Sequence, residues 1–225
     1  MTAALLRAPR ILCISGSNRI GSVNTKLATI ATRMLQSKGA ETTQLNLVDH
    51  DLPLYSQDLE EKGAPPSVLK LKEMFGSADA LMIASPEYNG AMTPALCNAI
   101  TWMSRPVADP KEPMYGSFKG KVGVVISTSP GGLGGLRGLL PTRQLLTNLG
   151  TNVLPEQVAI GGAFKAFEGE GDGIKLKSGD QEKLLDATMT RLFETARGVA
   201  NQEAVCQIVQ ETIRANEYGE VHIAS

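Results

Sequence analysis

Three loops of this sequence carry residues whose types and spacing could bind a ligand. The first loop, residues 16–25 (GSNRIGSVNT), joins a short apolar run to a helical pattern. Besides backbone N–H groups at a helix start, it offers the hydroxyls of Ser17, Ser22 and Thr25, the Asn24 amide and the Arg19 cation. Such donors at the positive end of a helix dipole favour a phosphate group. The alternative is a plain N-cap turn, in which serine and asparagine are preferred without any ligand.

The spacing of the first loop excludes two well-known phosphate motifs. It is not a P-loop, because the position after the spaced glycines holds Ser22 and the required lysine is absent. It is not GxGxxG either, which disfavours an NAD-binding Rossmann protein with Asp49 or Asp51 on the ribose. The residues therefore predict an anion site without naming the ligand.

Two further loops could contact a flat ligand. Residues 85–93 (SPEYNGAMT) place Tyr88 among turn formers, where its ring could stack on a planar group or hydrogen-bond to it. Residues 127–138 (STSPGGLGGLRG) contain enough glycine to bring backbone amides close to a ligand. The alternatives are a turn ahead of a helix for the second loop and a flexible linker for the third. We favour a ligand site in the third loop, because it lies between a buried strand and a helix instead of between domains.

Apolar patterns predict the elements that position these loops. Strands are expected at residues 10–15, 42–48, 80–84 and 122–126 and within 153–160. Helices are expected at 23–35 with a stop at Gly39, at 67–75, at 92–103, from Gly138 to Leu149 with Pro141 in the first turn, and at 185–199. The alternation predicts an α/β protein with a doubly wound parallel sheet, which binds ligands beyond the carboxyl ends of its strands.

Two segments lie outside this pattern. Residues 161–177 are rich in glycine and acidic residues, which is typical of a surface loop. Residues 201–225 show helical periodicity at Val205, Ile208, Val209 and Ile213 beyond what a five-stranded sheet needs, so we expect them to pack on a neighbouring subunit. The prediction is one domain over residues 1–225, with a core at about 10–200 and residues 201–225 as an extension.

Composition excludes several classes of protein. The net charge of −1 argues against a nucleic-acid partner, which requires a basic face. The three cysteines are far apart, which predicts neither a disulfide framework nor a CxxC pair and fits a reducing compartment. His50 and His222 have no partners at metal-ligand spacing, so no metal is expected. No run has membrane-span length and the start does not read as a signal peptide, which predicts a cytoplasmic protein without membrane contact.

The segments GSNRIGSVNTKL, SPEYNGAMTPALCNAITW and SPGGLGGLR resemble, in order and spacing, three signature loops of the NADPH-dependent FMN reductase family. Because LPLYSQDLE at residues 52–60 resembles a further family segment, the resemblance covers nearly all of residues 10–200. It implies a flavodoxin-like fold with a five-stranded sheet in the order 2-1-3-4-5, FMN as cofactor, and NADPH or NADH as cosubstrate. It also implies a homodimer or homotetramer that reduces small acceptors such as quinones, azo compounds, free flavin or chromate.

The resemblance also implies the site residues. The phosphate of FMN would be held by Ser17, Arg19, Ser22, Asn24 and Thr25. The isoalloxazine ring would be lined by Pro86, Glu87, Tyr88, Asn89 and Gly90, and its other edge would be closed by Ser129, Gly131 and Gly132. The flavin carries the chemistry in a ping-pong reaction, so no catalytic side chain is expected and Glu87 is not assigned a proton. Arg137 and Arg105 are candidates for the 2′-phosphate of NADPH.

The alternative function is a non-enzymatic FMN carrier or redox sensor of flavodoxin type, which would use the same loops without a nicotinamide pocket. Such proteins are typically strongly acidic and shield the flavin with aromatic residues. Here the net charge is close to zero, and the third loop offers glycines where a shielding aromatic residue would stand. Both features favour an enzyme.

Overall fold

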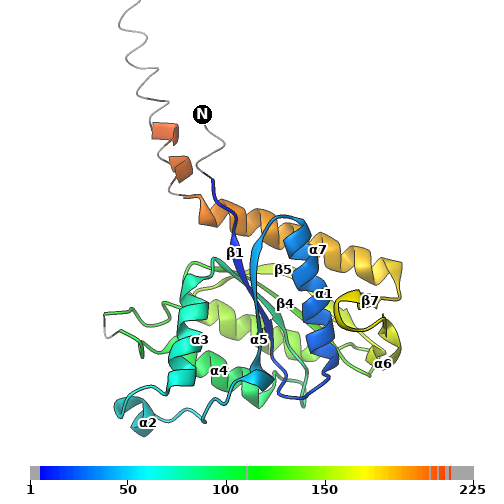
Figure 1. Ribbon diagram of the computed structural model, residues 1–225, viewed down its shortest axis with the longest axis horizontal. Coiled ribbons are helices and arrows are strands. Elements are labelled where there is room, and N and C mark those ends of the chain that lie inside the picture. Colours follow the sequence, from blue (N-terminus) through cyan, green and yellow to red (C-terminus); the bar gives the residue numbers. More distant parts are fainter. Residues whose placement is uncertain (1–5, 110, 203, 207, 211–212, 214–225) are drawn as a thin grey trace, which may run out of the picture.

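The computed structural model describes residues 6–109, 111–202, 204–206, 208–210 and 213, and its centre is a parallel sheet (Figure 1). The strands are β1 (Arg10–Ser15), β2 (Glu41–Asn46), β3 (Ala80–Ala84), β4 (Val122–Thr128) and β5 (Asn152–Ile160). They form one five-stranded sheet in the order β2-β1-β3-β4-β5 with all pairs parallel. The predicted flavodoxin-like fold and strand order are thereby confirmed.

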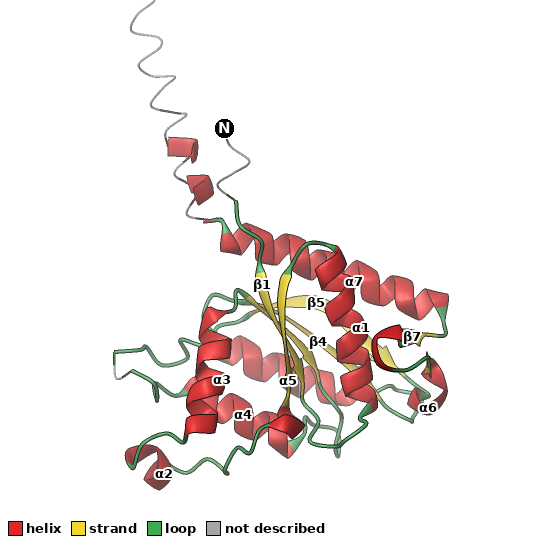
Figure 2. Ribbon diagram, viewed as in Figure 1, coloured by secondary structure: helices red, strands yellow, loops and turns green. Residues whose placement is uncertain are grey.

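Helices cover both faces of this sheet (Figure 2). On one face lie α1 (Val23–Ser37) and α7 (Gly179–Ala200), and on the other lie α3 (Pro66–Ser77), α4 (Pro94–Ser104) and α5 (Leu136–Asn148). The short helices α2 (Gln57–Glu61) and α6 (Ala163–Ala166) lie in connections. Since both faces are covered, β3 and β4 are buried throughout, which explains their continuous apolar runs. No helix in the described part of the chain is long and apolar enough to cross a membrane.

Several predicted boundaries were wrong by a few residues. Strand β2 ends at Asn46, and a 3₁₀ turn at Leu47–Asp49 takes up Val48. Ser127 and Thr128 belong to β4 and not to the third loop. Met92 precedes α4, whose N-cap is Thr93.

The start of α5 was also predicted wrongly. The helix begins at Leu136, so Pro141 lies inside it and not in the first turn. Pro141 has no N–H to donate to the carbonyl four residues earlier, which costs one helical hydrogen bond. In the first turn of the helix Gly138 packs closely on the second loop, since an added Cβ would lie 3.0 Å from the Ala91 carbonyl oxygen and 3.2 Å from the Glu87 Cβ. This contact between distant segments leaves no periodic signal in the sequence.

Residues 161–177 lie mostly at the surface, as predicted, but the prediction that they form no further element was wrong. After α6, strand β6 (Phe167–Glu168) pairs antiparallel with β7 (Lys175–Leu176). Ile174 and Leu176 are buried in the core that β1 and β4 share with α1 and α7. The two strands hold one apolar residue each, Phe167 and Leu176, within a glycine-rich, acidic segment. This is too short an alternation of apolar and polar residues to recognise as a strand.

The tail after α7 is described only in part. Residues 202, 204–206, 208–210 and 213 are helical, with Val205, Val209 and Ile213 exposed to solvent. The predicted helical periodicity agrees with these residues, and the rest of the segment lies outside the described residues.

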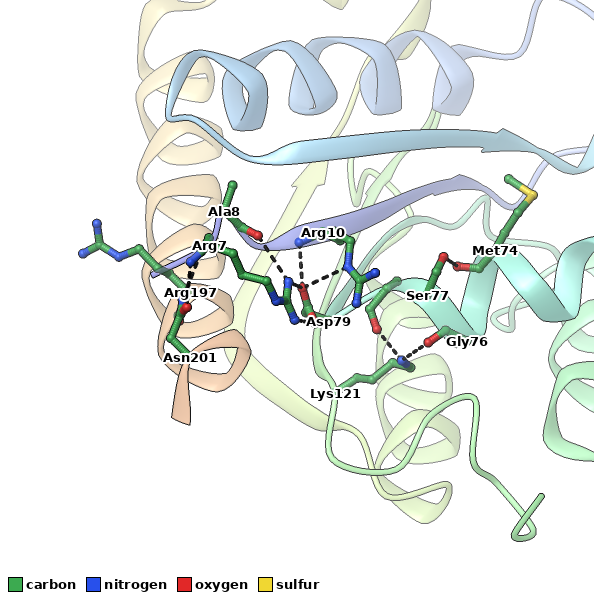
Figure 3. A network of polar contacts seen from close by, with 11 residues as sticks. Arg7, Ala8, Arg10, Met74, Gly76, Ser77, Asp79, Lys121, Arg197 and Asn201 are labelled. Atoms are coloured by element: carbon green, nitrogen blue, oxygen red, sulfur yellow. Dashed lines mark hydrogen bonds and ion pairs between the residues drawn. The ribbon is translucent and has the colours of Figure 1, made fainter. Parts of the chain in front are cut away.

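A charged network fastens the N-terminal segment to the amino edge of the sheet (Figure 3). Asp79 accepts hydrogen bonds from Arg7 Nη1 and Nη2, both at 2.6 Å, and from the Arg10 amide at 2.8 Å. Asn201, just beyond α7, accepts from the Arg7 amide at 2.9 Å and donates to the Arg7 carbonyl at 3.0 Å. The segment before β1 and the end of α7 are thus held together.

This network predicts a pH dependence of stability. Burial opposes ionisation of Asp79, but the hydrogen bonds from Arg7 and the Arg10 amide outweigh it and hold the pKa below its ordinary 3.8. A carboxylate with a depressed folded pKa stabilises the fold above its unfolded pKa, and this contribution disappears as pH falls through the folded value. In urea denaturation, the wild type should therefore lose more free energy of unfolding than Asp79→Asn between neutral pH and about pH 3. Parallel pH profiles of the two proteins would contradict this assignment.

Candidate functional site

A pocket at the carboxyl ends of the central strands brings the three predicted loops together. From the first loop it is lined by Ser17, Arg19, Ser22, Val23 and Asn24, from the second by Pro86, Glu87 and Tyr88, and from the end of β4 and the third loop by Thr128, Ser129 and Pro130. Phe164 of α6 completes the lining. Ligands of doubly wound sheets bind at this position.

The first loop presents donors at the start of α1. Ser22 is the N-cap, whose hydroxyl accepts from the Asn24 amide at 3.2 Å, and the Ser17 hydroxyl accepts from the Arg19 amide at 3.2 Å. Both serines are only 3% exposed, and each hydroxyl retains its own proton for donation. The Arg19 side chain is exposed at this pocket and has no hydrogen bond or ion pair within the described residues. The two serine hydroxyls and the Arg19 cation together form a candidate anion-binding site, called the anion seat below.

Two other polar residues of this loop are engaged by the protein itself. Asn24 donates through Nδ2 to the Thr128 carbonyl at 2.8 Å and accepts through Oδ1 from the Thr128 amide at 3.0 Å. The Thr25 and Ser15 hydroxyls are hydrogen-bonded at 2.7 Å, and Thr25 lines a neighbouring cavity instead of this pocket. Asn24 therefore joins the first loop to the end of β4, and of its side-chain donors one Nδ2 hydrogen remains for a ligand.

The second loop is a tight turn tied to the first loop. Asn89 and Gly90 have φ of +54° and +78°, and the Tyr88 and Ala91 backbones exchange hydrogen bonds at 2.9 and 3.0 Å. This is a two-residue hairpin with both central residues left-handed. Its tip, Asn89 and Gly90, does not line the pocket, whereas Tyr88 lies at the pocket and is half exposed. Thr93 behind the turn donates to the Gly16 carbonyl at 2.5 Å and so joins the two loops.

The third loop is held by two glycines with positive φ. A Cβ added to Gly134 would lie 2.5 Å from the Ile160 amide nitrogen. A Cβ added to Gly135 would lie 2.0 Å from the Ser127 Oγ. Gly131 and Gly132 do not line the pocket, and an added Cβ on Gly132 would meet nothing within 4 Å. The third loop therefore packs closely on β4 and β5 at Gly134 and Gly135, whereas Ser129 lines the pocket.

Among the described residues that line the pocket, Glu87 is the one carboxylate, and its oxygens are already bonded. Oε1 accepts from Arg137 Nε at 2.9 Å and Nη2 at 2.6 Å, and Oε2 accepts from the Gly138 amide at 3.1 Å. Glu87 thus caps α5, which agrees with leaving it without a proton-transfer role. Arg105 likewise pairs with Glu60, at 2.9 Å beside another cavity. Both candidates for the 2′-phosphate are therefore already paired with a glutamate.

Four lining residues were missing from the sequence prediction, namely Val23, Thr128, Pro130 and Phe164. The first three adjoin predicted residues and needed only wider boundaries. Phe164 is 74% exposed and comes from the segment expected to be a plain surface loop. The available signal was an aromatic residue four positions after the carboxyl end of β5, at the edge where doubly wound sheets place their ligands.

The fold and the pocket together define a flavodoxin-like mononucleotide-binding protein. The buried serine hydroxyls and unpaired Arg19 suit the phosphate of FMN, and the pocket continues past Pro86 and Tyr88, which suit a flat ring. Residues 9–165 match the NADPH-dependent FMN reductase family, and the chain belongs to that family.

Known relatives support this membership. The chain is 36% identical over 164 residues to the NAD(P)H-dependent FMN reductase of Pseudomonas aeruginosa, covering 72% of this chain and 83% of the relative. It is 32% identical over 159 residues to a quinone reductase of Escherichia coli, covering 69% and 79%. The structure of FerB, a flavoenzyme NAD(P)H:(acceptor) oxidoreductase from Paracoccus denitrificans, matches with a TM-score of 0.71 at 28% identity, covering 84% and 97%. The predicted enzyme class is confirmed: the chain is an oxidoreductase that uses FMN and NAD(P)H.

Proposed function

We propose that this reductase passes electrons from NAD(P)H to small flat acceptors, with quinones as the principal class. One NAD(P)H and one proton are consumed for each quinone that leaves as hydroquinone. The observation that carries the proposal is the convergence of all three loops on one pocket, with an anion seat at α1 and aromatic residues beside it. Relatives named quinone reductase support the choice of acceptor, and azo compounds, free flavin and chromate are further candidates.

The pocket residues divide into two groups in this proposal. Ser17, Ser22 and Arg19 hold the phosphate of FMN, and Pro86 and Tyr88 flank its ring. When bound, FMN supplies the electron-accepting ring. The protein residues bind and orient it, and Glu87 moves no proton because Arg137 and the Gly138 amide occupy its carboxylate.

The colour of the purified protein tests this function. We expect it to be yellow with FMN, to bleach when NADPH is added without oxygen, and to regain its colour when a quinone follows. A yellow protein that is inert to both NADPH and NADH would be a carrier or sensor, and a protein that stays colourless after FMN addition would be neither. Steady-state comparison of NADPH with NADH gives the nucleotide preference.

Arg19→Ala is expected to weaken FMN binding about tenfold, because the phosphate loses a charge-assisted hydrogen bond. Fluorescence titration of the apoprotein with FMN measures the effect. Lys26→Ala is the matched control, since Lys26 is an exposed cation in the first turn of α1 that does not line the pocket. Unchanged affinity in Arg19→Ala, or an equal loss in both variants, would remove Arg19 from the phosphate site.

The proposal includes a cytoplasmic homodimer or homotetramer in which residues 1–225 form one domain. Leu133, Leu136 and Leu140 are exposed along and just before α5, which gives a second copy an apolar surface to cover. Sedimentation of the intact chain tests this assembly. A chain ending at Asn201 keeps the hydrogen bonds to Arg7, and an unchanged number of subunits and unchanged stability would show that the tail has no part in the assembly.

A further inference from the structure

Glu87 and Arg137 form an ion pair between the second loop and α5. The shortest contact, Arg137 Nη2 to Glu87 Oε1, is 2.6 Å. The Glu87 side chain is 8% exposed and lines the pocket, whereas the Arg137 side chain is 67% exposed. The pair therefore has its negative end at the flavin site and its positive end toward solvent.

Helix α5 depends on this pair because it lacks a cap of its own. Its N-cap is Gly135, and its first turn contains no acidic residue. The unpaired N–H groups of a first turn carry the positive end of the helix dipole. Glu87 accepts from the Gly138 amide of this turn at 3.1 Å, and the same N–H also donates to the Gly135 carbonyl at 3.1 Å. A carboxylate from another loop thus offsets both the positive end of the α5 dipole and the positive charge of Arg137.

The pocket has few other charges. Its described lining contains one carboxylate, Glu87, and one cation, Arg19. Two-electron reduction makes a flavin ring more negative, so a charge beside it changes how readily it is reduced. Resting on the proposed placement of FMN, we propose that the Glu87–Arg137 pair sets the reduction potential of FMN in this pocket, with Glu87 as a positioning and electrostatic residue and not a catalytic one.

The two partners have opposite expected effects. In Glu87→Gln, Arg137 and the α5 start lose their counter-charge, which favours the reduced flavin and raises its midpoint potential. In Arg137→Gln, the Glu87 carboxylate loses its partner, which disfavours the reduced flavin and lowers the potential. Loss of loop structure would instead affect both variants alike, because each removes the same link between the second loop and α5.

The test measures midpoint potentials of the FMN-loaded proteins by equilibration with a reference dye. Each single variant should change the ratio of reduced to oxidised flavin about tenfold at a fixed ambient potential, which is about 30 mV for a two-electron couple. The double variant should return toward the wild type. Glu60→Gln is the matched control, since it breaks an equivalent Arg–Glu pair beside a different cavity and should leave the potential unchanged.

Glu87→Asp keeps the charge on a shorter side chain and should retain a potential near that of the wild type. A shift as large as that of Glu87→Gln would assign the effect to shape and overturn the proposal. Shifts of the two single variants in the same direction, or no shift in either, would also overturn it. Failure of the wild-type protein to bind FMN or to react with NAD(P)H would instead overturn the proposed function, and it is measured first.

Discussion

Gly134→Ala is expected to abolish FMN binding and to lower the free energy of unfolding by about 3 kcal/mol or more. Gly134 has φ of +62°, and an added Cβ would lie 2.5 Å from the Ile160 amide nitrogen and 2.6 Å from the Ala159 carbonyl carbon. These are backbone atoms of β5, and they cannot move aside as the end of a flexible side chain can. The third loop would have to move away from β5, which would deform the pocket wall at Ser129.

Urea denaturation of the apoprotein and FMN titration measure the two effects separately. Gly132→Ala is the matched control, because Gly132 has no positive φ and an added Cβ would meet nothing within 4 Å. We expect Gly132→Ala to leave the stability of the apoprotein unchanged. Weaker FMN binding in this control would place Gly132 against the bound flavin. A Gly134→Ala protein as stable as the wild type would show that the loop is not held where the structure places it.

Lys72→Met is expected to lower the free energy of unfolding by about 3 kcal/mol. The Lys72 side chain is 4% exposed, and its Nζ donates to the Met103 carbonyl at 2.7 Å and to the Arg105 carbonyl at 2.5 Å, and pairs with Glu112 at 3.0 Å. Lys72 of α3 thereby caps the end of α4. Methionine would fill the space of the side chain but would leave two carbonyls and a carboxylate without their partner.

Thermal and urea unfolding test this expectation, with Lys70→Met as the control. Lys70 lies two residues earlier on α3 and is exposed, so its replacement removes the same charge without breaking buried bonds. Equal unfolding midpoints for the two variants would contradict the role of Lys72 as a buried cap. FMN affinity should change little in Lys72→Met, because Lys72 does not line the pocket.

The sequence predicted the elements of the sheet because their signals are local. Strand β3 was predicted with its correct bounds, since five consecutive apolar residues bounded by polar ones suit a strand buried on both faces. The start of α5 and the β6–β7 pair were predicted wrongly, and both make contacts with distant segments that leave no local signal in the sequence. Gly138 packs on Glu87, and Leu176 enters a core built mainly by other elements.

The sequence predicted which loops meet at the pocket better than it predicted which of their polar groups are free to bind a ligand. Strand topology alone brings the three loops to one edge, where Ser17, Arg19 and Tyr88 line the same pocket. Which polar groups remain free depends on pairings across the fold. Asn24 is engaged by Thr128 at a sequence separation of 104 residues, and no spacing within the first loop reports that bond.

The bonds between Arg7 and Asn201 mean that two distant points of the chain lie side by side at the amino edge of the sheet, away from the pocket. A short glycine-serine linker could therefore join these points, and the chain could be opened at the exposed turn around Gly63. In such a circular permutant the strands would follow one another along the chain in a different order, while each strand kept its neighbours in the sheet. Retained FMN affinity in this permutant would show that the pocket is defined by the sheet and not by the order of synthesis.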